Sequence, residues 1–135
     1  MTRKEKQLLL TDLSARLPYG VKICVGDYIC ALLDINTEIG NKSNGETFHT
    51  VGFNKPDGNY DFCAMTEVKP YLRPMSSMTE EEDTRRCAFL DDIEGMVEDA
   101  IYNYIDWLNK NGFDYRGLIP MGLALEAKEG MYETE

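Results

Sequence analysis

The spacing of hydrophobic residues changes abruptly at Pro18, and this change constrains the fold more than any other feature. Before Pro18, Thr2 and Glu5 form a capping box and leucines then recur at helical spacing, which predicts a helix over residues 3–17. After Pro18, apolar and polar residues alternate, which predicts short strands. A helix followed by strands indicates an α+β fold.

Residues 20–68 are expected to form a small antiparallel meander of about four strands. Gly26 and Asp27 suit a two-residue hairpin turn, because glycine readily adopts the positive φ required at the first position of a type II′ turn. The meander could close into an SH3-like barrel or stay a half-open sheet against the first helix, and both alternatives remain open. The expected strands are 21–25, 28–35, 46–53 and 60–65, joined by a polar loop at 36–45 and a turn at 54–59.

Residues 69–78, KPYLRPMSSM, are expected to connect the sheet to the helices that follow. The two prolines bias the residues before them towards extended backbone, so this connector predicts a turn or a single 3₁₀ turn. Tyr71 and Leu72 are the side chains expected to pack on the sheet. A polyproline ligand is the alternative, and it is disfavoured because the proline spacing is not PxxP.

Residues 79–111 are expected to be helical and acidic, beginning at a second capping box formed by Thr79 and Glu82. One unbroken helix would be about 50 Å long. A domain of this size is about 36 Å across, so we expect a break near Asp91. Trp107 is expected to anchor this region in the core. The predicted apolar face contains Ile93, Met96, Val97, Ala100, Ile101, Tyr104, Trp107 and Leu108.

Residues 112–135 are expected to form a short helical turn, a short final strand or extended end at LALEA, and a frayed tail. A chain of 135 residues with 43% hydrophobic residues can build one real core. We therefore expect a single domain over residues 1–135.

The net charge of −10 comes entirely from the C-terminal part of the chain. Residues 1–78 contain nine acids and nine bases, whereas residues 79–135 contain fifteen acids and five bases. Such a surface repels phosphate backbones, so direct binding to nucleic acid is not expected. A basic protein partner suits it better.

Tyr102 is expected to be an exposed aromatic residue among carboxylates, because it lies opposite the apolar face on the helical wheel. Its neighbours one turn away are Glu98, Asp99 and Asp106. Tyrosine is enriched at binding hot spots, so these four residues form the candidate partner-binding set, with Tyr71 as a further candidate. The alternative is an exposed tyrosine without a function.

Catalytic, cofactor-binding and metal-binding residues are not expected. The four cysteines lack paired spacing and His49 is the only histidine, so we expect buried, reduced thiols and no zinc site. The stretch DGNYD at 57–61 is like the start of an EF-hand loop, but it lacks the later glycine and glutamate, so it predicts a turn. A glycine-rich phosphate loop is also absent from the sequence.

Three blocks of sequence carry a resemblance to known proteins: QLLLTDLSARLPYGVK, KPYLRPMSSMTEEE and DWLNKNGFDYRGLIPMGLALEAKEGMY. Together they make up roughly half of the chain. The chain resembles a widespread family of small uncharacterised proteins from gut bacteria, their phages and prophages. The resemblance implies a phage or prophage gene whose product acts inside a bacterial cell, and it implies no activity and no catalytic residue.

Three functions remain as alternatives. The first is a non-catalytic accessory or protein-binding protein, whose acidic face would attract a basic partner. The second is a small-ligand or nucleotide-binding protein, or a small enzyme, with a pocket between sheet and helix. The third is an acidic inhibitor that mimics nucleic acid.

The cytoplasm is the expected location. The sequence has no run of about 18 apolar residues that could span a membrane. Asp12 and Arg16 interrupt the apolar core that a signal peptide would need.

Overall fold

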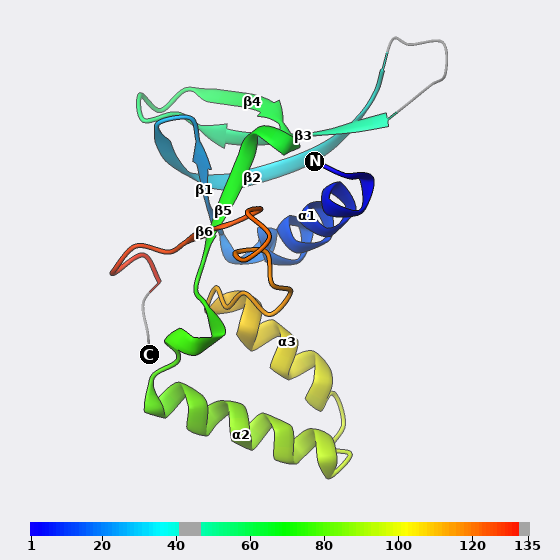
Figure 1. Cartoon of the computed structure of the whole chain (residues 1–135), viewed down its shortest axis with the longest axis vertical. Helices are drawn as coiled ribbons and strands as arrows, with labels where there is room; N and C mark the ends of the chain where they lie inside the picture. The colour runs from blue at the N-terminus through cyan, green and yellow to red at the C-terminus, as the bar shows by residue number, and fades with distance from the viewer. Residues whose placement is uncertain (41–46, 133–135) are drawn as a thin grey trace.

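The computed structural model describes residues 1–40 and 47–132, and these form a first helix, a sheet and a helical hairpin (Figure 1). The class is α+β, as predicted. None of the helices in this described part is long and apolar enough to cross a membrane. The helices are α1 (Arg3–Arg16), α2 (Glu80–Glu94) and α3 (Ala100–Lys110), and 3₁₀ turns cover Leu17–Tyr19, Met65–Glu67 and Met75–Ser77. The strands are β1 (Lys22–Val25), β2 (Tyr28–Ile39), β3 (Thr47–Asn54), β4 (Tyr60–Ala64), β5 (Val68–Leu72) and β6 (Leu125–Glu126).

The described strands form one six-stranded sheet in the order β4-β3-β2-β1-β5-β6. All neighbours are antiparallel except β5 and β6, which run parallel. The sheet does not close, because β4 and β6 are separate edges, so the SH3-like barrel is wrong and the alternative of an open sheet is confirmed. The prediction of about four meander strands missed β5, whereas β6 lies within LALEA, where a short final strand or extended end was predicted.

The first hairpin forms at the predicted turn. Val25 pairs with Tyr28, and Gly26 between them has a φ of 56°. Asp27 is not among the residues with positive φ, which gives the type II′ geometry. Local turn chemistry was therefore sufficient to place this hairpin.

Strand β2 is longer than predicted, because residues 36–39 belong to it and not to a loop. Asn36 pairs with Thr50 and Ile39 pairs with Thr47, so the ladder with β3 outweighs the polar composition of this stretch. The rest of the predicted loop, 41–46, lies outside the described residues. The predicted turn at 54–59 is confirmed: Asp57 accepts a hydrogen bond from the backbone N–H of Asn59 at 2.9 Å.

The expected connector 69–78 is wrong in its first half, because Val68–Leu72 is strand β5 in the interior of the sheet. Pro70 lies opposite Ile23 of β1. On the other side of β5, β6 pairs only with Tyr71 and Leu72, so it needs no hydrogen bond from the backbone of Pro70, which has no N–H. The single 3₁₀ turn is confirmed at Met75–Ser77. Tyr71 and Leu72 are buried, as predicted.

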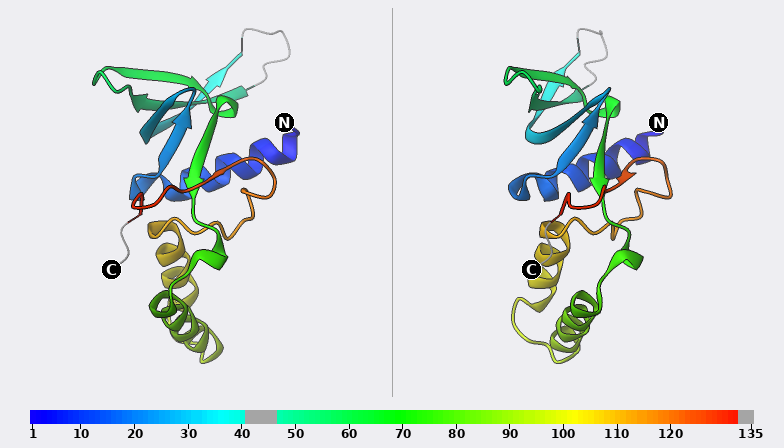
Figure 2. Two further views of the ribbon diagram at one scale, coloured as in Figure 1. Left: turned by 60° about the vertical axis from the view of Figure 1, so that its left-hand side comes forward. Right: turned by 90° about the vertical axis from the view of Figure 1, so that its left-hand side faces the viewer.

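The core lies between the inner face of the sheet and α1, which crosses it (Figure 2). It also includes residues from the irregular segment after α3. The prediction that all four thiols are buried is wrong: Cys87 is exposed and Cys24 and Cys63 are half-buried, so only Cys30 is a buried thiol. All four cysteines are free, as predicted. The main core residues are Leu9, Leu13, Ile23, Leu32, Val51, Phe53, Val68, Leu72, Leu118 and Leu123.

The helical region breaks, but not at Asp91. Helix α2 continues to Glu94, and α3 begins at Ala100 and folds back along it (Figure 1). The break shifts the residues around it out of the predicted apolar face, so Met96, Val97 and Ile101 are exposed instead of buried.

The C-terminal segment is better ordered than predicted. LALEA supplies β6, and the backbone N–H of Ala127 donates to the carbonyl of Leu72 at 2.7 Å. The ring of Tyr132 lies against Gly112, at a place that a Cβ would occupy. The expected frayed tail is therefore wrong as far as Tyr132.

Candidate protein-binding surface

The helical hairpin is joined to the sheet through Arg73, which follows β5. Its guanidinium donates two hydrogen bonds to the carboxylate of Glu82, at 2.8 and 2.7 Å, and lies 4.2 Å from the ring centroid of Phe113. Its backbone N–H donates to Gly112 at 2.7 Å, and its carbonyl accepts from Asp114 at 2.8 Å. One residue thus connects the strand, the start of α2 and the end of α3.

The Arg73 guanidinium holds the pKa of Glu82 below its ordinary value, mainly by hydrogen bonding, although burial acts in the opposite direction. Glu82 also caps α2, as the sequence predicted: it accepts from the N–H of Thr79 at 3.0 Å. The charged carboxylate of Glu82 therefore stabilises both the start of α2 and the contact of α2 with Arg73.

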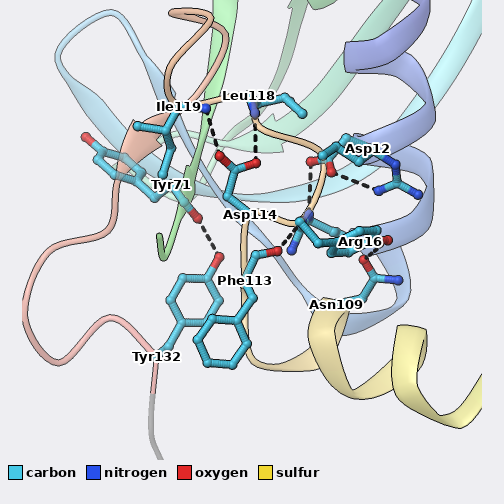
Figure 3. Close-up of polar contacts among 11 residues, drawn as sticks. Asp12, Arg16, Tyr71, Asn109, Phe113, Asp114, Leu118, Ile119 and Tyr132 are labelled. Atoms are coloured by element: carbon cyan, nitrogen blue, oxygen red, sulfur yellow. Dashed lines mark hydrogen bonds and ion pairs between the residues drawn. The ribbon is translucent and has the colours of Figure 1, made fainter. Parts of the chain in front are cut away.

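A buried charge cluster lies beside this joint (Figure 3). Asp12 accepts from Arg16 Nε and from Arg116 Nη1, both at 2.9 Å, and Asp12 and Arg16 are fully buried. Arg16 also donates to the carbonyl of Phe113 at 2.6 Å. The cluster therefore fixes α1 to the segment that follows α3.

Asp12 and the nearby Asp114 both accept hydrogen bonds from other parts of the fold. Asp114 accepts from the backbone N–H groups of Leu118 and Ile119, at 2.8 and 2.9 Å (Figure 3). Among buried side-chain polar atoms of the described residues, only Arg16 Nη1 has no partner. Across residues 1–40 and 47–132, no group of three or more metal-ligating residues forms a candidate metal site. We assign this cluster to the stability of the fold.

The phenol of Tyr132 closes the same region. It donates to the carbonyl of Tyr71 at 2.5 Å (Figure 3), and burial raises its pKa to about 12. This hydrogen bond holds the C-terminal segment against β5. Tyr71 is only 5% exposed, so its place in the candidate partner-binding set is wrong.

Stacked aromatic rings hold α2 and α3 together. Phe89 lies 5.6 Å from Tyr104 and 5.5 Å from Trp107, and Trp107 lies 5.4 Å from Phe113. Trp107 is packed as predicted but is only half-buried, so it anchors the hairpin at the edge of the core. Phe113 is the fully buried ring of this group, and Leu108 beside Trp107 on α3 is also buried.

The turn between α2 and α3 has a defined geometry. The N–H of Val97 donates to the carbonyl of Asp92 at 2.9 Å and that of Met96 to Ile93 at 3.1 Å, which is the Schellman pattern. The αL position of this motif favours glycine, but here it holds Met96, with a φ of 57°. The glycine of this turn, Gly95, lies one residue before the αL position and not at it. The αL backbone of Met96 therefore carries strain of about 1 kcal/mol.

This strained turn presents apolar side chains to solvent. Met96 is 90% exposed, Val97 53%, Ile101 60% and Tyr102 73%. We call these four residues the tip patch. The sequence predicted the exposure of Tyr102 but missed the other three, and Gly95 was the one signal for a helix end before them.

Carboxylates surround the tip patch. Between Cys87 and Asn109 the chain contains six acids and no base. Glu98, Asp99 and Asp106, which the sequence grouped with Tyr102, are all exposed. Glu98, Asp99 and Tyr102 lie at the tip of the hairpin, whereas Asp106 lies further along α3. The six acids are Asp91, Asp92, Glu94, Glu98, Asp99 and Asp106, and we call them the acidic rim.

A second group of exposed aromatic residues lies on β3 and β4, at Phe48, Tyr60 and Phe62. Tyr60 donates to Asp34 at 2.9 Å across Gly52, where there is no space for a Cβ. On edge strand β4, the N–H of Phe62 donates to the carboxylate of the preceding residue at 2.8 Å. This bond blocks part of the edge against pairing with another strand.

Comparison with protein-family models, with curated proteins and with solved structures found no match to this chain.

Proposed function

We propose that this protein is a non-catalytic accessory protein of phage or prophage type, which binds a basic protein partner inside a bacterial cell. The tip patch and the acidic rim form the binding surface. The resemblance of the three sequence blocks supports the setting, and the helical hairpin supports the mode of action.

The observation that carries this proposal is the exposed tip patch within a rim of one charge sign. Exposed apolar patches mark interaction sites. Tyr102 offers a large contact area with a polar tip, as binding hot spots do. The acidic rim would accelerate association with a basic surface and make binding weaker as salt rises.

The apolar patch also favours a protein partner over mimicry of nucleic acid. A phosphate backbone has no apolar group that corresponds to Met96, Val97 or Ile101. An inhibitor that competes with nucleic acid would instead need carboxylates spaced like phosphates.

The test is site-specific photo-crosslinking in a bacterial lysate. A benzophenone amino acid at position 102 should crosslink to one basic protein, and the yield should fall as salt rises from about 0.05 to 0.5 M. Ile101→Ser should abolish this crosslink. The matched control carries the benzophenone at Phe62, which has a similar exposure of 62% on the sheet.

The proposal fails if position 102 crosslinks no protein, or if the crosslinked protein is captured equally from position 62. It also fails if the yield does not depend on salt, because the acidic rim would then play no part.

A further inference from the structure

A groove of about 420 Å³ runs along one side of the hairpin, between α2, α3 and the 3₁₀ turn after α1. It lies near the sheet end of the hairpin, away from the tip patch, because its members on α3 extend to Lys110. Its volume falls within the range of about 300–1,000 Å³ that is usual for small-ligand sites.

The apolar part of the groove is aromatic. Phe89 and Trp107 line it with their ring centroids 5.5 Å apart, and Tyr19 reaches it from the end of α1. Both rings of the α2–α3 contact are half-buried, so each packs on one side and remains accessible on the other. A planar ring can stack on such surfaces.

The charges of the groove differ from those of the rest of the hairpin. Arg85 and Lys110 are its two cations, and the Arg85 guanidinium lies 5.8 Å from the ring centroid of Phe89. Asp106 is its only carboxylate among the lining residues. Burial raises the pKa of Tyr19, and the charge of Asp106 and its hydrogen bond with the Tyr19 phenol raise it further. The groove is therefore a positive site in a chain of net charge −10.

We infer that this groove binds a small aromatic anion, with the ring on Phe89 and Trp107 and the anionic group facing Arg85 and Lys110. Arginine and lysine are the side chains that recognise carboxylates, and both stand at the rim of the aromatic surface. The side-chain amide of Asn103 also lines the groove and can donate to the same anionic group. This inference does not use the tip patch, and the groove shares one residue, Asp106, with the acidic rim.

Trp107 is the only tryptophan of the chain and lines the groove, so its fluorescence can report on binding there. We would titrate the full chain with 2-naphthoate and, in parallel, with the neutral 2-naphthamide. The carboxylate should quench Trp107 saturably at one site, and the amide should bind about 9- to 25-fold more weakly, because it loses both exposed charge pairs.

Arg85→Gln and Lys110→Gln should each weaken naphthoate binding by a similar factor, about three- to five-fold. Arg86→Gln is the matched control, because it removes the same charge from the next residue, which pairs with Asp83 at 3.1 Å and does not line the groove. Tyr102→Ala is the control for binding at the tip patch. Neither control should change the titration.

The inference is overturned if naphthoate does not quench Trp107 saturably, or if the amide binds as well as the carboxylate. It is equally overturned if Arg86→Gln weakens binding as much as Arg85→Gln, because the effect would then come from overall charge.

Discussion

At the scale of single residues, the buried pair of Asp12 and Arg16 has the largest expected effect on stability. Its two members lie one helical turn apart on α1, with no exposure to solvent, and Asp12 is shared with Arg116. Removing one partner of a buried pair leaves an uncompensated charge, which is more costly than the pair itself is favourable. Arg16 would then face the interior without a carboxylate, with only the Phe113 carbonyl and the Tyr115 ring beside its guanidinium.

We therefore expect Asp12→Ala to lower the free energy of unfolding by about 3–5 kcal/mol. Urea denaturation followed by circular dichroism measures this change. Asp57→Ala is the control, since that side chain is exposed in a surface turn and should cost much less. A loss below about 1 kcal/mol for Asp12→Ala would show that the charge cluster does not hold the fold together.

At the scale of secondary-structure elements, the α2–α3 turn combines strain with exposure. Met96 adopts an αL backbone that glycine would adopt at no steric cost, and its side chain contributes no buried area. Strain at an exposed, apolar position is typical of a residue kept for binding. Stability and function should respond in opposite directions to its replacement.

Met96→Gly should leave stability unchanged or raise it by up to about 1 kcal/mol, as relief of αL strain outweighs the greater entropy of glycine in the unfolded chain. The same variant should weaken crosslinking to the partner from position 102. Thermal unfolding and crosslinking yield measure the two effects. Ala88→Gly, in the exposed middle of α2, is the control and should be destabilising. A Met96→Gly protein that is clearly destabilised would contradict the assigned strain.

Elements governed by local chemistry were the ones that sequence predicted well. The capping boxes at Thr2 and Thr79 and the turn at Gly26 each depend on a few neighbouring residues, and all are confirmed. Strand β5 was missed because Pro70 argues against an interior strand. It is tolerated here because β6 does not pair with residue 70, which the sequence alone does not reveal. The exposure of Ile101 was missed because the helical wheel assumes an unbroken helix, and the break at Met96 changes the phase.

The candidate site follows the same division. Tyr102 and its three acidic neighbours could be grouped from sequence because they lie within one or two helical turns. The burial of Tyr71 depends on strand pairing with β1 and β6 and on the C-terminal segment, whose Tyr132 donates to the Tyr71 carbonyl, and these partners are distant along the chain. The groove at Trp107 brings together three separate elements, and no pattern in the sequence indicates it.

At the scale of the whole molecule, the hairpin extends from the sheet as an arm, with α2 on its far side (Figure 1). Helix α2 contacts mainly α3, and Glu82 is its one buried residue. Its direct ionic link to the rest of the chain is the pair of Arg73 and Glu82. The position of α2 should therefore depend on the charge of Glu82.

The sign of this pH dependence follows from the lowered pKa of Glu82. The unfolded carboxyl takes up its proton at a higher pH than the folded one, so the pair stabilises the fold fully above the ordinary value of 4.5. That contribution is lost as the pH falls through the lower pKa of the folded state. Amide hydrogen exchange in α2 should accelerate over this range relative to α1, once corrected for intrinsic rates.

Glu82→Gln should remove this pH dependence and give faster exchange in α2 already at pH 7. Glu81→Gln is the control, because Glu81 is exposed and takes no part in the pair of Arg73 and Glu82. Equal protection of α2 in wild type and Glu82→Gln at pH 7 would show that the aromatic contacts alone position the arm.

The parallel pairing of β5 with β6 has a consequence for the time course of folding. Tyr71 meets Leu125, and the core that begins with Leu9 is completed only by Leu118 and Leu123. Contacts between such distant positions form slowly, because a long loop must close first. A ribosome delivers these leucines long after Leu9, so the growing chain carries an unfinished core until they are made. Chaperones would meet this protein with part of its inner sheet face uncovered, and the emergence of Leu118 and Leu123 would end that exposure.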